Sequence, residues 1–137
     1  MINDFTFKNL KVWQESILLA KRIYKLTKTF PKDEMYGLTS QLRRAVTSIS
    51  LNIAEGRGKY SRKDFIKYLY QARGSLFEVI TCIELSCELE MLNNKIKEEL
   101  LIQSSLIQRL LSGLIKSIKE KDEMDSQPLT HPVTQSL

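Results

Sequence analysis

Apolar residues recur at steps of three and four over most of the chain, and short polar breaks divide this pattern into four stretches. The first covers 10–29 and ends before Pro31, and the second begins near Glu34. The third covers 61–91 and the fourth 95–121. This spacing is typical of amphipathic helices, so the pattern predicts four helices and no strand.

One stripe of residues in each stretch is expected to face the core. The stripes are Leu10, Trp13, Ile17, Ala20 and Tyr24 in the first helix, Leu38, Leu42, Ala45, Ile49, Asn52 and Gly56 in the second, Phe65, Leu69, Ala72, Leu76, Val79 and Ile83 in the third, and Ile96, Leu100, Ile107, Leu110, Leu114 and Ile118 in the fourth. Short connections force neighbouring helices to run antiparallel. The predicted fold is therefore an all-α, antiparallel up-down-up-down four-helix bundle.

The breaks between helices carry capping signals. The segment 56–60, with two glycines, is expected to end the second helix. Ser61 is then the expected N-cap of the third helix, and Asp64 completes a capping box. Asn94 is expected to cap the fourth helix. The bundle domain is predicted over 1–122, followed by a disordered tail at 123–137, which has two prolines and no periodicity.

Composition agrees with one small globular domain, with 42% hydrophobic and 27% charged residues. The N-terminus lacks the basic and apolar regions of a signal peptide, and no apolar run is long enough to span a membrane. Cys82 and Cys87 are five residues apart on a helix, so their side chains diverge and both thiols are expected to be buried and reduced. The predicted location is the cytoplasm, without a membrane partner.

The net charge of +5 is concentrated in one part of the chain. Between Ser40 and Ser75, two anions, Glu55 and Asp64, stand against eight cations. The eight cations are Arg43, Arg44, Arg57, Lys59, Arg62, Lys63, Lys67 and Arg73. Such a concentration predicts contact with a polyanion, RNA or DNA. The alternative is a solvated helix face whose charges are balanced by acids on other helices.

The segment 56–61 contains glycine and lysine but does not fit a P-loop, since Ile53 occupies the position of the first glycine and the preceding segment is helical. A basic loop that leads into a helix N-terminus nevertheless offers backbone N–H groups and a positive dipole end to a phosphate. Tyr60 is available to stack on a base. We therefore predict a phosphate-backbone site here.

Catalysis, metal binding and cofactors are not expected. The single histidine, His131, lies in the tail, and a di-iron bundle site would need Glu-x-x-His pairs that the chain lacks. A weaker alternative is a ligand site on the polar strip of Ser48, Asn52 and Glu55, beside the apolar seam of the second helix.

The third helix is more apolar than one core-facing stripe requires. Ile66, Tyr70, Phe77 and Ile80 point to another side of the helix, where a monomer would expose them. This surface predicts a homo-oligomer, unless the first and fourth helices cover it.

Several motifs follow one another at characteristic spacing, among them Phe30-Pro31, Tyr36-Gly37-Leu38, the run Asn-Ile-Ala-Glu-Gly at 52–56 and Gly74-Ser75-Leu76. In this respect the chain closely resembles, over about residues 5–120, the four-helix bundle proteins encoded in intervening sequences of 23S ribosomal RNA genes. The resemblance implies a homo-oligomer with a pentamer favoured. A related accessory protein of diversity-generating retroelements binds nucleic acid and partners a reverse transcriptase, which implies RNA, DNA or such a protein as possible partners.

The leading hypothesis is thus a non-catalytic, oligomeric bundle protein that binds nucleic acid through its second and third helices. The alternative is a structural or protein-binding scaffold, in which the arginines pair with Glu55 and Glu78 across helix or subunit boundaries.

Overall fold

The computed structural model describes residues 5–126. The four helices are α1 (Lys11–Thr27), α2 (Leu38–Arg57), α3 (Arg62–Glu88) and α4 (Asn94–Ser126), and two 3-10 turns, η1 (Thr6–Asn9) and η2 (Lys32–Glu34), precede α1 and α2. Within these residues there is no strand. The predicted all-α class with four helices is confirmed.

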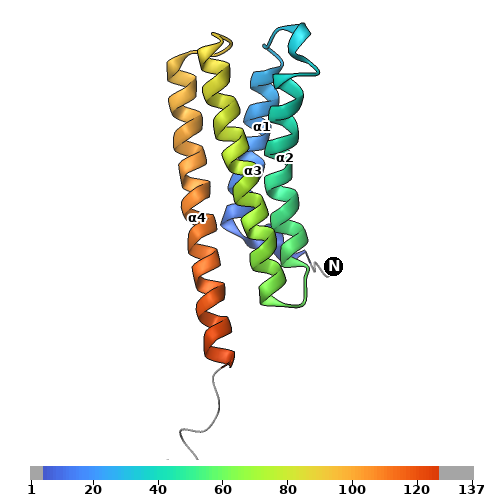
Figure 1. Ribbon diagram of the computed structural model, residues 1–137, viewed down its shortest axis with the longest axis vertical. Helices are drawn as coiled ribbons and strands as arrows, with labels where there is room; N and C mark the ends of the chain where they lie inside the picture. Colours follow the sequence, from blue (N-terminus) through green and yellow to red (C-terminus); the bar gives the residue numbers. More distant parts are fainter. Residues whose placement is uncertain (1–4, 127–137) are drawn as a thin grey trace, which may run out of the picture.

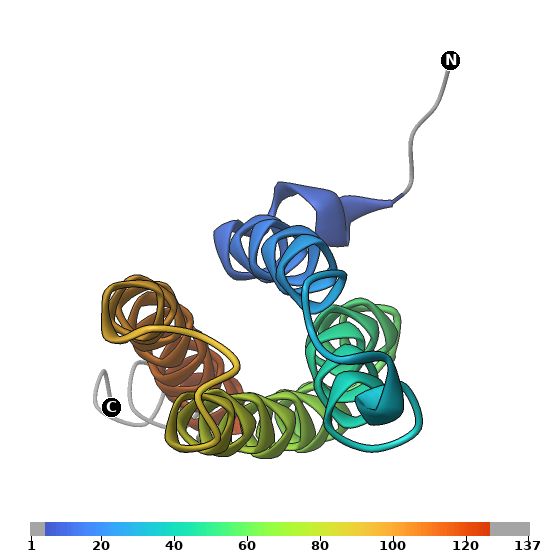
Figure 2. The same cartoon turned by 90° about the horizontal axis from the view of Figure 1, so that it is seen from above.

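Consecutive helices run in opposite directions and lie side by side, and α4 returns against α1 (Figures 1 and 2). The turn between α2 and α3 lies at the end of the bundle where α4 finishes, and α4 extends beyond that turn (Figure 1). The C-terminal half of α4 therefore lies beside the first half of α3.

The core is formed by aliphatic side chains from all four helices. Fully buried examples include Leu19, Ile49, Leu76 and Ile107. In α2 and α3 the buried residues follow the predicted stripes closely, although Asn52 and Phe65 are only half-buried.

The predicted stripe of the first helix is correct only in part, since Leu10, Trp13 and Ala20 are half-buried and pack against the core. The buried residues of α1 are Val12, Ser16, Leu19, Ile23 and Thr27, whereas Ile17 and Tyr24 are 39% and 41% exposed. The reason lies in two polar residues that the apolar pattern passes over. The Ser16 hydroxyl donates to the Trp13 carbonyl oxygen at 2.7 Å, and the Thr27 hydroxyl donates to that of Ile23 at 2.8 Å. Hydroxyls satisfied by their own helix can be buried at little cost.

The same effect shifts the stripe of α4. Ser104 is buried and donates to the Leu100 carbonyl oxygen at 2.8 Å. The buried stripe continues through Leu111 and Ile115, and the predicted Leu110 and Leu114 are only half-buried beside it.

The helix ends agree with the sequence in part. The Ser61 hydroxyl accepts a hydrogen bond from the Asp64 amide at 3.1 Å, as predicted. Within residues 5–126 the Asp64 carboxylate makes no return bond, so Asp64 acts on the α3 N-terminus through its charge alone. At α4 the cap is Asn93 instead of Asn94: Asn93 Oδ1 accepts from the Ile96 amide at 2.9 Å. The predicted break at 56–60 is confirmed, because α2 ends at Arg57 with Gly58 as its C-cap.

The boundary predicted at residue 122 falls inside α4, which is helical to Ser126. The remainder of the predicted tail, 127–137, lies outside the described residues. No helix in the described part of the chain is long and apolar enough to cross a bilayer.

Candidate nucleic-acid interface

Four of the eight predicted cations gather around the turn between α2 and α3. Arg57, Lys59, Lys63 and Lys67, which we call the hairpin cations, are all exposed. Within residues 5–126 none of them forms an ion pair, and the nearest charge-dependent contact is that of Lys59 Nζ, 5.2 Å from the centre of the Tyr68 ring. The hairpin cations are therefore free to meet an anion from solution.

The turn that carries these cations is fixed from both sides. Gly56 packs against Phe65 and Tyr68 of α3 so closely that a Cβ at residue 56 would lie 2.6 Å from the Tyr68 Cβ. Ser61 caps the first turn of α3. Between them, Tyr60 is fully exposed. An exposed aromatic ring among cations is the arrangement that suits an unstacked base.

Arg62, although next to the hairpin cations, is engaged with α4. It pairs with the carboxylate of Asp125, and its Nη1 donates to the Lys121 carbonyl oxygen at 3.2 Å. The guanidinium thus joins the beginning of α3 to the end of α4, and part of its charge is already neutralised.

Arg43 lies elsewhere. Its Nε donates to the Thr27 hydroxyl at 2.9 Å, and its Cζ is 4.9 Å from the centre of the Tyr24 ring. It precedes Arg57 by almost four turns of α2, or roughly 20 Å along the axis. Arg44 is exposed at the same end of α2. The structure therefore does not bring these two arginines together with the hairpin cations.

Arg73 belongs to a second basic cluster that the sequence analysis missed. The Arg73 Cζ is 4.7 Å and the Lys119 Nζ 5.3 Å from the centre of the Tyr70 ring, and Lys119 also donates to the Tyr70 hydroxyl at 2.8 Å. Lys116 lines the same groove between α3 and α4. Tyr70 and Lys119 are far apart in sequence, so only the return of α4 along α3 shows that they are neighbours.

The hydrogen bond from Lys119 is the largest effect on the pKa of Tyr70 and lowers it. Burial opposes this as the second-largest effect, and the positive charges of Lys119 and Arg73 lower the pKa by smaller amounts. The variant Lys119→Met removes the hydrogen bond and one charge. We expect the pKa of Tyr70 to rise in this variant, since the phenolate loses the groups that favour it. The titration of the Tyr70 ring carbon by NMR measures the shift. Lys95→Met, which changes an exposed lysine at the opposite end of α4, should leave the pKa of Tyr70 unchanged.

The predicted oligomer surface on α3 is divided by the fold. Ile66 and Ile80 share a side of the helix with Glu84, which pairs with Lys97 of α4 at 3.5 Å. Both isoleucines are half-buried and pack against the core. Tyr70 is engaged by Lys119, and Phe77 remains 48% exposed. The expected exposure thus holds for Tyr70 and Phe77 only.

The polar strip of α2 faces α3, and its polar groups form hydrogen bonds with one another and with Ser75 of α3. The Ser48 and Ser75 hydroxyls are 2.8 Å apart, and Asn52 Nδ2 donates to the Ser48 carbonyl oxygen at 2.8 Å. Glu55 and Glu78 are exposed, and within residues 5–126 neither forms an ion pair. The strip therefore offers a link between helices but no enclosed ligand site.

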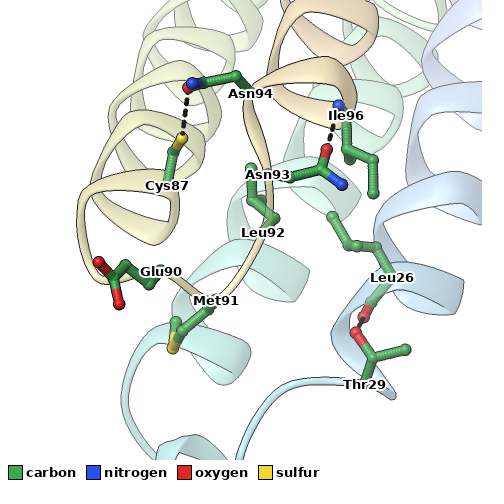
Figure 3. Close-up of a pocket in the computed structure, with 9 residues that line it drawn as sticks. All are labelled: Leu26, Thr29, Cys87, Glu90, Met91, Leu92, Asn93, Asn94 and Ile96. Atoms are coloured by element: carbon green, nitrogen blue, oxygen red, sulfur yellow. Dashed lines mark hydrogen bonds between the residues drawn. The ribbon is translucent and has the colours of Figure 1, made fainter.

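A depression of about 660 Å³ lies at the turn between α3 and α4 (Figure 3). Its polar groups are directed at one another: Cys87 Sγ contacts Asn94 Oδ1 at 3.2 Å, and the Thr29 hydroxyl donates to the Leu26 carbonyl oxygen at 2.7 Å. Glu90, at φ 60°, ends α3 in the left-handed conformation. These contacts serve to close helix ends, so the depression is a weaker candidate than the basic surfaces.

Both cysteines are free, as predicted, but only Cys82 is buried, whereas Cys87 is half-buried. Burial raises the pKa of the Cys82 thiol, and the neighbouring Glu78 carboxylate adds to the effect. Within residues 5–126 no three residues are grouped as metal ligands.

Comparison with known proteins places this chain beside a protein family and beside solved structures. A family described as the 23S rRNA-intervening sequence protein matches residues 8–113. A crystal structure of a protein of unknown function, from the S23 ribosomal protein family of Bacteroides thetaiotaomicron, is 31% identical, with a TM-score of 0.72. That match covers 77% of this chain and 95% of the other. Among curated proteins none matches.

Proposed function

Because the chain belongs to the 23S rRNA-intervening sequence protein family, we propose that it is a non-catalytic protein that binds RNA or single-stranded DNA through the turn between α2 and α3. The observation that carries the proposal is the exposure of the hairpin cations without a carboxylate partner in the described residues. Surface cations of one sign attract phosphates and release the counterions condensed on them.

Recognition of a single strand follows from the geometry of the turn. The hairpin cations attract successive phosphates, and Tyr60 presents a free ring to an unstacked base. Figure 1 shows α2 and α3 side by side within the bundle, and neither extends past the turn that joins them, unlike a helix that projects into a major groove. Binding is therefore expected to depend on strand shape and charge more than on sequence.

Fluorescence anisotropy with a labelled oligouridylate, repeated over a series of salt concentrations, tests the proposal. If the four hairpin cations each neutralise one phosphate, log K should fall with log salt at a slope of about −3. The slope is shallower than eight cations would give, because Arg43 and Arg62 are engaged within the bundle. Absence of binding at low salt, or binding that salt does not weaken, would contradict the proposed function.

The scaffold alternative requires the arginines to pair with acids. Arg43 does have a structural role, since it contacts Tyr24 and Thr27 of α1. The expected pairs with Glu55 and Glu78 do not form within residues 5–126. The absence of these pairs between helices supports nucleic-acid binding for the turn, while Arg43 holds α2 to α1. Pairing across subunit boundaries stays a prediction of the alternative.

The proposal includes assembly into a homo-oligomer, with the pentamer favoured by the family resemblance. Support comes from apolar residues on the outer side of α3, where Phe77 and Leu85 are 48% and 47% exposed. It also includes a cytoplasmic location, since Cys82 and Cys87 are free thiols and reducing compartments keep thiols in that state. A protein partner such as a reverse transcriptase stays a prediction from the resemblance.

A further inference from the structure

The groove between α3 and α4, which we call the Tyr70 groove, brings cations from two helices to one place. Its volume is about 390 Å³. Arg73 of α3 and Lys116 and Lys119 of α4 line it together with Tyr70. Ser112 and Ile115 line the groove on the side toward the beginning of α4, and Glu120 and Glu123 line it toward the end of that helix.

The cations in the groove are held by an aromatic ring instead of by carboxylates. Arg73 and Lys119 both lie about 5 Å from the centre of the Tyr70 ring. The ion pairs of residues 5–126 include neither of them, nor Lys116. Glu120 and Glu123 line the same groove and offset part of this charge at longer range, but within residues 5–126 neither forms an ion pair with these cations, and the three cations outnumber the two carboxylates. Like charges at short distance repel, so a bound anion would lower the energy of this arrangement.

The ring is occupied in a way that selects against a base. The Arg73 guanidinium lies 4.7 Å from the ring centre, and the Tyr70 hydroxyl accepts from Lys119 at 2.8 Å, beyond the edge of the ring. Tyr70 therefore orients positive charge and differs from Tyr60, whose ring is fully exposed. The group that fits such a site is an oxyanion that accepts several charge-assisted hydrogen bonds.

The carboxylates of Glu120 and Glu123 limit the kind of molecule that can carry this oxyanion. A phosphodiester strand that followed α4 beyond Lys119 would meet Glu120 and Glu123, and like charges would oppose it. A terminal phosphate needs only the end of the groove that carries Arg73, Lys116 and Lys119. It also carries close to two negative charges, whereas a phosphate within a strand carries one.

We propose that the Tyr70 groove binds a terminal phosphomonoester. Two sources share this chemistry, the phosphorylated end of a nucleic-acid strand and a free mononucleotide. The first rests on the proposed function, because the strand would reach the groove from the hairpin cations on the same half of α3. The second does not depend on it.

Two oligothymidylates of equal length, labelled at the 3′ end and carrying either a 5′-phosphate or a 5′-hydroxyl, distinguish the sources by anisotropy. The phosphorylated strand should bind about tenfold more tightly, since charge-assisted hydrogen bonds to one phosphate suffice for that ratio. Phosphorus NMR of AMP with the full chain provides a direct second measurement. A shifted AMP resonance without a difference between the strands would identify the free nucleotide as the ligand.

The variants Lys119→Met and Arg73→Gln should each abolish the preference for the phosphorylated strand or the AMP shift. Lys95→Met removes an exposed lysine of α4 at its opposite end and should preserve both. Equal affinity for the two strands together with no AMP shift would overturn the inference, and so would a full preference in Lys119→Met. If neither strand binds at low salt, the proposed function fails, and the AMP spectrum alone decides the inference.

Discussion

Replacing Gly56 by alanine should lower the free energy of unfolding by about 2 kcal/mol, because an added methyl overfills the contact between α2 and α3. A Cβ at this position would lie 2.6 Å from the Tyr68 Cβ, 3.1 Å from Phe65 Cδ1 and 3.3 Å from the Phe65 carbonyl oxygen. Two of these atoms belong to or lie next to the α3 backbone, so no flexible side chain can move aside. The helices themselves must separate.

Chemical denaturation followed by circular dichroism measures the change in stability. Gly113→Ala is the matched control, because Gly113 is also inside a helix and a Cβ there would have nothing within 4 Å. Alanine should stabilise α4 by about 0.5–1 kcal/mol through helix propensity alone. The two glycines should therefore respond with opposite signs. Equal responses would show that the close approach at Gly56 does not limit the packing of α2 on α3.

The same substitution bears on function, since Gly56 directly precedes the turn that carries the hairpin cations. If α2 and α3 separate, Lys59 and Lys63 change their spacing while the charge of the protein is unaltered. A loss of nucleic-acid affinity in Gly56→Ala would therefore report on geometry and not on charge.

The double variant Arg57→Glu/Lys59→Glu should weaken binding to RNA or single-stranded DNA by about 100-fold at moderate salt, since two phosphate contacts are lost and two repulsions are added. Both residues are exposed and make no ion pair within residues 5–126, so the fold should be preserved. Anisotropy over a salt series should also show a slope less negative by about 1.5, half of the value for four contacts. The loss should be similar for all sequences, because these cations contact phosphates.

A second double variant, Lys25→Glu/Lys28→Glu, tests whether the change in net charge alone weakens binding. It makes the same change in formal charge at exposed positions near the end of α1, at the opposite end of the bundle. Binding should weaken only slightly, because charges beyond about 10 Å are largely screened at physiological salt. If both doubles weaken binding equally, the turn between α2 and α3 is not the binding surface.

The two basic surfaces have different chemistry although they share α3. The hairpin cations are exposed and separate, which suits a mobile polyanion and a salt-dependent affinity. The cations of the Tyr70 groove are oriented by one ring and its hydroxyl, which suits a single, highly charged group. If one strand occupied both surfaces, its backbone phosphates would contact the hairpin cations and its phosphorylated end would lie in the Tyr70 groove.

The sequence by itself determined the four helices, their antiparallel order and the Ser61 cap. These features depend on local spacing and on short connections, which periodicity records directly. It also located the concentration of positive charge, because neighbours in sequence supply most of it.

Only the tertiary structure decided which of those charges are free. Arg43 contacts α1, Arg62 pairs with α4, and Lys119 joins Arg73 at Tyr70. Such contacts depend on which sides of distant helices meet. The same cause explains the buried Ser16 and Ser104, whose hydroxyls bond within their own helices and so enter a core that an apolar pattern assigns to their neighbours.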